Sequence, residues 1–137
     1  MIFDTETAIL SRLASKLAPG SVLVGTFGVV DLTDDSTSPV IGQLLLMRIG
    51  SSGDDRGNAA RITLDYAFSV FCDIYRSTDP QKAAAAQMLV DAGNALAGWQ
   101  SAPGKISQIV DGQDTGFDGR VLRLSIGFTI PAFFVGS

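Results

Sequence analysis

The chain has 137 residues, of which 46% are hydrophobic and 18% charged, and this predicts one compact domain over residues 1–137. Ten basic and fourteen acidic residues give a formal net charge of −4 at pH 7, which disfavours binding to the phosphate backbone of DNA. The chain contains no histidine, so Ser-His-Asp triads, Cys-His nucleophiles and HExxH zinc sites are excluded.

Cysteine usage and hydropathy bear on the compartment. The single cysteine, Cys72, forms neither an internal disulfide nor a thiolate cage, which is typical of an intracellular protein. No apolar stretch approaches the roughly 20 residues that span a bilayer, and the N-terminus lacks a signal-peptide pattern. We therefore expect neither export nor a membrane partner.

The N-terminal segment predicts a helix, a strand and a loop. Apolar residues recur at helical spacing over residues 5–18, with Asp4 as the expected N-cap: Ile9, Leu10, Leu13 and Leu17. Residues 21–32 mix valines and leucines with Gly25 and Gly28, which indicates a twisted or bulged strand. The polar stretch 33–39 predicts a loop.

The middle of the chain predicts a long antiparallel hairpin. Residues 40–49 are apolar at both parities, which is typical of a strand covered on two faces or of a seam between subunits. Residues 50–60 are small, polar and glycine-rich, and predict a long connection. Strict alternation over residues 62–74 then predicts a long, half-buried strand, on whose apolar parity Cys72 is expected to be buried and inert.

A second helix is expected next, with Asp79 as N-cap, Pro80 at its first position and Gly98 as its stop. Its buried stripe is expected to contain Met88, Leu89, Ala92 and Leu96, with Trp99 folded back onto that stripe.

The last part of the chain predicts a short strand at 105–110, a loop at 111–119 and a final alternating strand at 120–130. The predicted fold class is therefore α+β: a mostly antiparallel sheet with a long hairpin, flanked on one face by two main helices.

Two glycine-containing segments superficially suggest ligand sites. Residues 98–105 have a spacing close to that of a phosphate loop, but they follow a helix, not a strand, so a helix stop and turn is favoured. Residues 111–116 look like the start of a calcium loop, yet Leu122 stands where the bidentate glutamate is needed. We expect no metal, no cofactor and no catalytic residue.

Acidic residues gather in the predicted loops. Eight of the thirteen aspartates fall there, and adjacent acidic loop residues usually just solvate the surface: Asp31, Asp34, Asp35, Asp54, Asp55, Asp111, Asp114 and Asp118. If copies of the chain formed a ring, such residues would line a channel that repels DNA phosphates; we assign this role to Asp31, Asp34 and Asp35.

The order of these elements resembles the tail terminator (minor tail) proteins of long-tailed bacteriophages, particularly the Mu-like group. The resemblance lies in the helix with Glu6–Leu10, the hairpin over residues 40–74, the helix ending in Gly98-Trp99, and the closing strand over residues 122–130. It covers nearly the whole chain and rests on the order and length of elements, without a catalytic signature.

The resemblance implies a structural virion protein, not an enzyme. Such a protein forms a homohexameric ring that caps the tail tube, stops its elongation and contacts the head-completion (connector) proteins, and DNA passes through its channel without specific binding. The implied location is the head-proximal end of the tail in the virion, and the host cytoplasm during assembly. The residues expected at subunit or partner interfaces are Leu44, Leu46, Arg48, Asp54, Asp55, Arg56, Arg61, Phe133 and Phe134.

Three alternatives stay open at this level. Phe133 and Phe134 either dock on a neighbouring subunit or pack on the chain's own first helix. The protein could instead be another head-tail connector or a tube component. From a different class, it could be a small enzyme or ligand-binding domain with a pocket at its sheet face and Trp99.

Overall fold

The computed structural model describes residues 2–32, 38–53, 59–102, 105–106 and 108–136, and describes only the backbone at 2–3, 51–53, 59–61, 101–102, 105–106, 108–115, 117–118 and 132–136. The elements, in chain order, are α1 (Ile2–Lys16), β1 (Leu23–Val24), β2 (Val40–Gly53), β3 (Ala59–Asp73), α2 (Asp79–Leu96), β4 (Gln100–Ala102), β5 (Lys105–Ile106), β6 (Gln108–Asp118) and β7 (Val121–Gly136). No helix in the described ranges is both long and apolar enough to cross a membrane.

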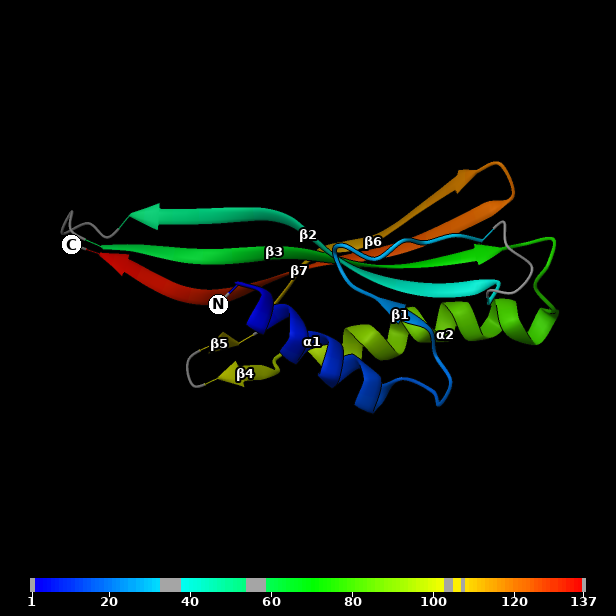
Figure 1. Cartoon of the computed structure of the whole chain (residues 1–137), viewed down its shortest axis with the longest axis horizontal. Coiled ribbons are helices and arrows are strands. Elements are labelled where there is room, and N and C mark those ends of the chain that lie inside the picture. The colour runs from blue at the N-terminus through cyan, green and yellow to red at the C-terminus, as the bar shows by residue number, and fades with distance from the viewer. Residues whose placement is uncertain (1, 33–37, 54–58, 103–104, 107, 137) are drawn as a thin grey trace.

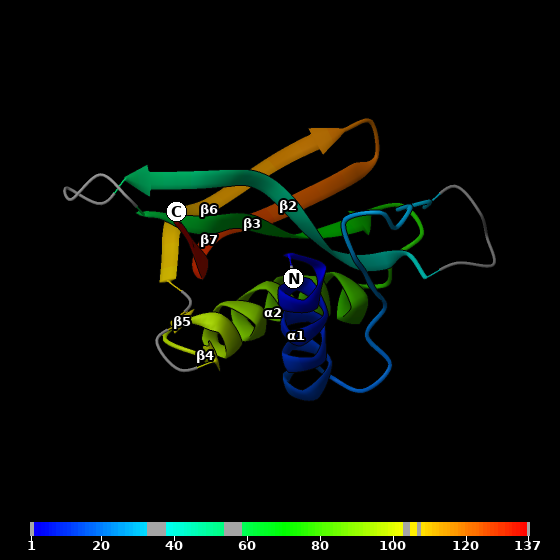
Figure 2. The same ribbon diagram turned by 60° about the vertical axis from the view of Figure 1, so that its left-hand side comes forward.

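A five-stranded sheet with the order β1-β2-β3-β7-β6 forms one layer, and the helices form the other. β1 pairs parallel with β2, whereas β2–β3, β3–β7 and β7–β6 are antiparallel. Both helices lie on the same face of the sheet, and the β6–β7 hairpin curls away from them (Figures 1 and 2). The predicted α+β class with two helices on one face is confirmed.

The core lies between the helices and one face of the central strands. The predicted alternation in β3 is confirmed, because Leu64, Tyr66, Phe68, Val70 and Cys72 are all buried. The stripes of both helices complete the core: Ile9, Leu13, Leu17, Ala85, Leu89, Ala92, Ala95 and Leu96. Burying one of the leucine or isoleucine side chains contributes about 1.5–3 kcal/mol to the stability of the fold.

Gly42 of β2 allows the close packing of this layer. A Cβ atom there would lie 2.8 Å from Cζ of Phe68 and 3.0 Å from Cδ2 of Leu23. The first distance is shorter than real Cβ contacts and the second is at their lower limit, so any larger residue at position 42 would displace the Phe68 ring.

The expected helix caps need correction. Thr78, not Asp79, caps α2: its Oγ1 accepts from the Gln81 amide at 3.3 Å, while its own amide donates to Gln81 Oε1 at 2.9 Å. This reciprocal capping box satisfies two amide donors, an arrangement that a cap at Asp79 would forgo. Asp4 lies in the first turn of α1, which begins at Ile2, and is not its N-cap.

The expected strand over residues 21–32 is reduced to two residues. The chain pairs with β2 only at Leu23 and Val24, and then turns where the Gly28 amide donates to the Gly25 carbonyl at 2.9 Å. The two glycines that suggested a bulge therefore end the strand and reverse the chain. The segment after the turn returns along the sheet, where Arg76 Nη1 donates to the Leu32 carbonyl at 2.7 Å.

Two expected loops are strands. β2 continues through residues 50–53 and β3 starts at Ala59, so the hairpin is longer than its glycine-rich sequence suggested. β6 occupies residues that were expected to form the 111–119 loop, so the backbones of Asp111, Asp114 and Asp118 lie in a strand paired with β7. Cross-strand pairing overrides the loop-like composition here, with register shifts at both sides of Asp111.

The strands extend beyond the helices at one end of the molecule. We call this extension the distal arm: residues 48–53 of β2, 59–63 of β3 and 131–136 of β7 (Figure 1). The arm begins at a register shift between Leu46 and Arg48, where Met47 is the extra residue of β2. The last described residues of the chain lie at the same end as the β2–β3 connection (Figure 1).

Candidate assembly surface

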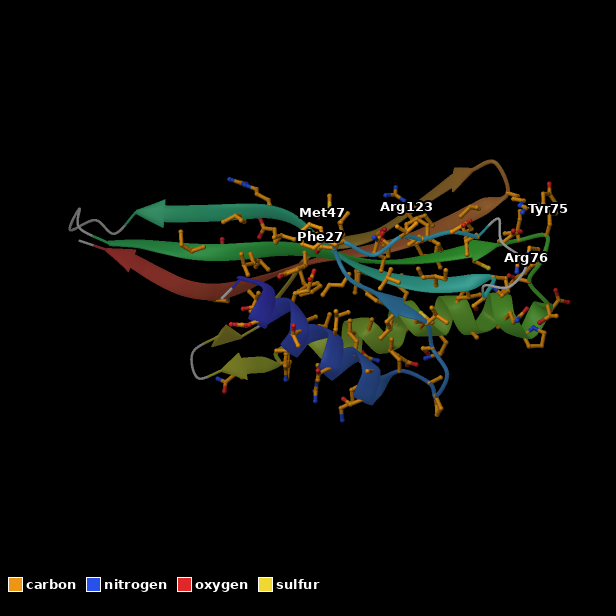
Figure 3. The ribbon with its side chains drawn as sticks, viewed as in Figure 1. Phe27, Met47, Tyr75, Arg76 and Arg123 are labelled. Atoms are coloured by element: carbon orange, nitrogen blue, oxygen red, sulfur yellow. The ribbon has the colours of Figure 1, made fainter. Side chains whose placement is uncertain are left out.

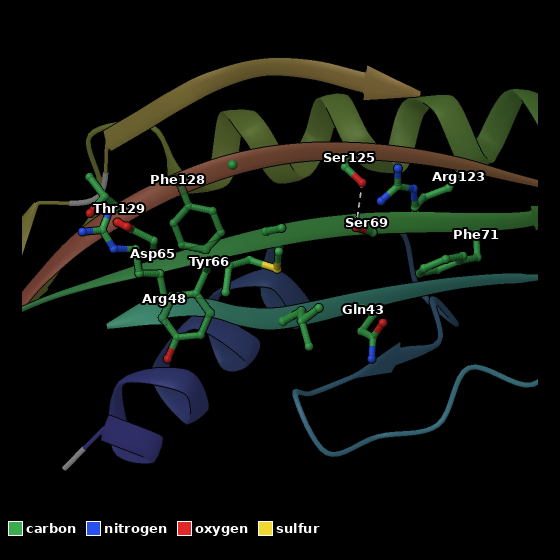
Figure 4. Close-up of a pocket in the computed structure, with 14 residues that line it drawn as sticks. Gln43, Arg48, Asp65, Tyr66, Ser69, Phe71, Arg123, Ser125, Phe128 and Thr129 are labelled. Atoms are coloured by element: carbon green, nitrogen blue, oxygen red, sulfur yellow. Dashed lines mark hydrogen bonds between the residues drawn. The ribbon is translucent and has the colours of Figure 1, made fainter. Parts of the chain in front are cut away.

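The face of the sheet opposite the helices contains a hollow of about 570 Å³ (Figure 4). Odd-numbered residues of β3, of β7 as far as Thr129 and of β2 before its bulge point to this face, because the even-numbered residues of β3 fill the core. Past the bulge the parity of β2 changes, so Arg48 points to this face as well. Among the lining residues are Gln43, Leu45, Arg48, Asp65, Phe71 and Arg123. The hollow therefore has an apolar floor with charged groups at its rim.

Two serines form the polar centre of the hollow. Ser69 Oγ and Ser125 Oγ are 2.7 Å apart in a buried cross-strand hydrogen bond, with Arg123 nearby on β7 (Figure 4). A serine nucleophile needs a general base, and an arginine does not serve as one because it stays protonated. In the described part of the chain, no group of three or more His, Cys, Asp or Glu residues is placed to hold a metal ion.

Exposed apolar side chains lie beside the β2 bulge. The exposed fraction is 80% for Phe27 and 61% for Met47 (Figure 3). The residues just before them in the chain are hydrogen-bonded, since the Leu46 amide donates to Thr26 Oγ1 at 3.0 Å. Ile49, in the distal arm, is 52% exposed. Phe27 and Met47 thus expose apolar surface at neighbouring positions.

A buried polar cluster holds the residue 25–28 turn against the edge of β2. Glu6 of α1 is buried, and its carboxylate accepts from both the amide and the hydroxyl of Thr26. The hydroxyl of Thr26 in turn accepts from the Leu46 amide, so a side chain replaces a strand at this position. α1 therefore determines where the paired edge of β2 ends.

Tyr66 lies beside this cluster, with its ring stacked on Phe128 at 5.6 Å between centroids and pointing from β3 toward α1 (Figure 4). Its hydroxyl is buried without a hydrogen-bond partner. Burial, with a smaller contribution from the negative charge of Glu6, raises the pKa of Tyr66 to about 12.

The opposite end of the sheet is closed by Asp73. Its Oδ1 accepts from the amides of Tyr75 at 3.0 Å and Arg76 at 3.2 Å, and its Oδ2 forms an ion pair with Arg120 Nε at 3.0 Å. The Asp73 side chain is fully buried, whereas the Arg120 side chain is 42% exposed. These contacts hold the end of β3 against the β6–β7 turn and stabilise the fold there.

Several residues expected at interfaces have a definite place in the structure. Leu44 is fully buried in the core, so its side chain offers no surface to a second subunit, and Leu46 is half-buried against the same core. Arg48 is exposed and pairs across the strands with Asp65.

The backbones of Arg61 and Phe134 pair with each other in the arm, and Phe133 pairs with Ile62. Asp31 is exposed in the segment before β2. Five expected site residues lie outside the described residues: Asp34, Asp35, Asp54, Asp55 and Arg56.

Cys72 and Trp99 test two further expectations. Cys72 is a buried free cysteine, with its Sγ 3.3 Å from Ser77 Oγ, as expected. Trp99 packs against the core on the helix side, where Arg12 lies 5.8 Å from its ring centroid. Trp99 does not line the hollow, so the hollow is not the pocket that the alternative of a ligand-binding domain places at Trp99.

The exposed residues Phe27, Val29 and Met47 were missed from sequence. Phe27 and Val29 were read as part of a strand, and Met47 as part of a strand covered on both faces. Exposure of Phe27 and Val29 could not be predicted from their spacing of two residues, because the same spacing is typical of a buried strand.

The fold defines a class: a small α+β subunit whose long antiparallel sheet is covered by helices on one face and open on the other. Two solved structures share it. One is the sheath/tube terminator, in its extended state, of the extracellular contractile injection system PVC, with 18% sequence identity and a TM-score of 0.56 over 100% of this chain. The other is a chain of the virion of a native gene transfer agent particle, with 15% identity and a TM-score of 0.61 over 92% of both chains.

This chain spans 58% of the length of the PVC terminator chain. No protein-family model and no curated protein sequence matches it. At these identities the likeness is one of fold.

Proposed function

We propose that this protein is a tail terminator, a structural component of a phage-like particle. In this role it forms a homohexameric ring that caps the tail tube, stops its elongation and provides the interface to the head-completion proteins. The observation that carries the proposal is the fold, which is shared over the whole chain with a sheath/tube terminator and over 92% of both chains with a virion component.

The surfaces of the chain support an assembly role. An open sheet face, a protruding arm and exposed apolar residues beside a strand edge suit contacts between proteins. Of the residues expected at interfaces, Arg48, Arg61, Phe133 and Phe134 belong to the arm, and Asp54, Asp55 and Arg56 stand between β2 and β3 in the sequence. We assign these residues to subunit or tube contacts.

The acidic character supports passage of DNA without binding. With a net charge of −4, six copies would carry a strongly negative ring, and we assign Asp31, Asp34 and Asp35 to the channel wall. The partners in this proposal are the tail tube protein and a connector protein. The location is the head-proximal end of the tail, reached from the host cytoplasm.

Addition of the purified protein to growing tail tubes tests the function. We expect tubes of fixed length, each with a ring at one end in negative-stain images, and six protomers per ring by light scattering. Tubes that keep growing, with no ring at either end, would contradict the proposal.

One alternative has an observation in its favour. A tube component or connector shares the need for edge-to-edge contacts, and the outer edge of β2 beyond Leu46 has no strand paired with it among the described residues. Open polymers of the protein alone, without tubes, would favour a tube component, because a contact that does not close yields a filament.

A further inference from the structure

Along β2, the backbone N–H and C=O groups of successive residues point alternately toward β3 and away from it. Before the bulge, Gly42 and Leu46 face outward, since their amides donate to the Val22 carbonyl and to Thr26 Oγ1. The extra residue Met47 shifts this parity, so that Ile49, Ser51 and Gly53 face outward in the arm. The first part of the edge is thus occupied by the chain itself, whereas the described strands leave the second part unpaired.

The parity of β3 supports this assignment. The Asp73 amide donates to the Pro39 carbonyl on the β2 side, and the Ile74 amide to the Arg120 carbonyl on the β7 side. Odd-numbered residues of β3 therefore face β2, and even-numbered residues face β7. Ile49, Ser51 and Gly53 pair with the even-numbered residues 64, 62 and 60, as outward-facing residues must.

The same rule gives the outer edge of β7. Pro131 and Phe134 pair with Thr63 and Arg61, which face β2, so both residues face away from β3, and so does Gly136. The described residues of β6 pair with β7 only as far as Thr129, and β5, which lies near β7, forms no ladder with it, so this part of the edge has no ladder partner among the described strands. Proline thus stands at an outward position, where its missing N–H costs no bond to β3.

The two unpaired edges match in height along the arm. Ser52 and Phe134 both pair with Arg61, so Phe134 lies level with the midpoint between Ser51 and Gly53. β2 and β7 run in the same direction, because each is antiparallel to β3. A parallel ladder needs this stagger: the Phe134 amide would donate to the Ser51 carbonyl, and the Gly53 amide to the Phe134 carbonyl.

We propose that the outer edge of β2 at residues 49–53 pairs in parallel with the outer edge of β7 at residues 132–136 of a second copy of this chain. β1 already pairs in parallel with the same edge of β2 at Gly42 and Gln43, so the second copy continues an addition that the chain begins. The contact is heterologous, so repeated copies build a ring when the rotation between neighbours closes, as the proposed function requires. This inference deepens the proposed function and rests on its ring.

Residue size and the ends of the two edges favour this occupant. Residues 50–53 are glycine and serine, so no bulky residue stands along this part of the β2 edge. Thr26 limits the pairing at one end of β2 and Pro131 limits it on β7, which fixes the register. The remaining edge, that of β6, has two register shifts that protect it from such pairing.

Disulfide trapping tests the pairing. Within one chain, residues 52 and 134 lie on either side of β3, roughly 10 Å apart by strand spacing, which is too far for a disulfide. In the proposed contact they are neighbours. We expect S52C/F134C to give reducible covalent oligomers larger than a dimer under oxidation, while each single variant and the wild-type chain, with its buried Cys72, stay monomeric on non-reducing gels.

A backbone variant tests the edge without relying on a disulfide. S51P removes an N–H that faces away from β3, so the melting temperature is expected to change by only a few degrees, whereas rings are lost by light scattering. S51A keeps that N–H and is expected to form rings as the wild type does.

The outcomes separate this inference from the proposed function. The pairing is overturned if wild-type rings form but S52C/F134C stays monomeric, if S52C alone dimerises, or if folded S51P assembles as S51A does; the ring itself then stands. If the cross-linked oligomers form but the protein does not stop tube growth, the pairing holds and the terminator function fails. If S51P does not fold, the cross-link decides.

Discussion

The helix-covered half of the sheet and the distal arm consist of the same three strands but differ in what covers them. In the first, Leu44, Phe68 and Phe128 are fully buried under α1 and α2. In the second, Ile49 is 52% exposed, although it pairs with the fully buried Leu64 and belongs to the same face. We infer that the covered half contributes most of the stability of the fold, whereas the arm offers surface and unpaired edges to other molecules.

The largest expected effect tests this division directly. Phe68→Ala should lower the free energy of unfolding by about 3–5 kcal/mol, because it leaves a cavity beneath both helices. Ile49→Ala should cost below about 1 kcal/mol in dilute protein, since half of that side chain already contacts water. Urea unfolding of both variants measures the difference; equal losses would show that the arm is as important for stability as the core.

The second prediction concerns the border between the two regions, where Tyr66 lies. The pKa of Tyr66 is raised to about 12 in the folded protein from 10 in the unfolded chain. The contribution of Tyr66 to the free energy of unfolding is therefore fully present below pH 10 and is lost as the pH rises to 12. The loss amounts to at most about 3 kcal/mol.

Tyr66→Phe should remove this alkaline loss, and Tyr75→Phe, whose ring is 79% exposed, should keep it. The free energy of unfolding of the three proteins between pH 9 and 12 measures it. An alkaline slope that is unchanged in Tyr66→Phe would assign the loss to another group.

A third test extends the comparison to the end of the sheet opposite the arm. Asp73→Asn removes the charge that faces Arg120 while leaving a carbonyl acceptor for the amides of Tyr75 and Arg76, and we expect a loss of about 2 kcal/mol. The matched control is Lys82→Ala, which removes an exposed pair with Asp79 at 4.0 Å and should cost below about 0.5 kcal/mol. Thermal unfolding compares them, and ring assembly should be unaffected in both.

The smallest effect sharpens the description of the covered half. Thr78→Ala removes the capping box of α2 and should cost about 1 kcal/mol. Asp79→Ala should cost only about 0.3–0.5 kcal/mol, through the helix dipole. The reverse order of melting temperatures would restore Asp79 as the cap.

Much of the fold could be predicted because the pattern of single elements is strong. The alternation in β3 and the helical stripe of α2 each determine both the element and its buried face. Two predictions failed because pairing between strands did not follow composition. β6 incorporates the glycine- and aspartate-rich residues 111–118. Of the valine-rich segment near Gly25 and Gly28, only Leu23 and Val24 form a strand, β1. Propensity is weak compared with the hydrogen bonds of a neighbouring strand.

The candidate surface was less predictable than the fold. Arg48 was expected at an interface and is exposed, whereas Leu44, an apolar neighbour in the same strand, belongs to the core. Strand alternation separates two faces but does not say which face the chain's own helices cover.

By itself, the sequence determined the elements with strict periodicity, the α+β class and the exclusion of histidine-dependent chemistry. Only the tertiary structure decided where the strands extend past the helices, which residue of β2 bulges, and which backbone groups face outward. The physical reason is that periodicity is a local property, set by 3.6 or 2 residues per repeat, whereas register and cover depend on segments far apart in the chain.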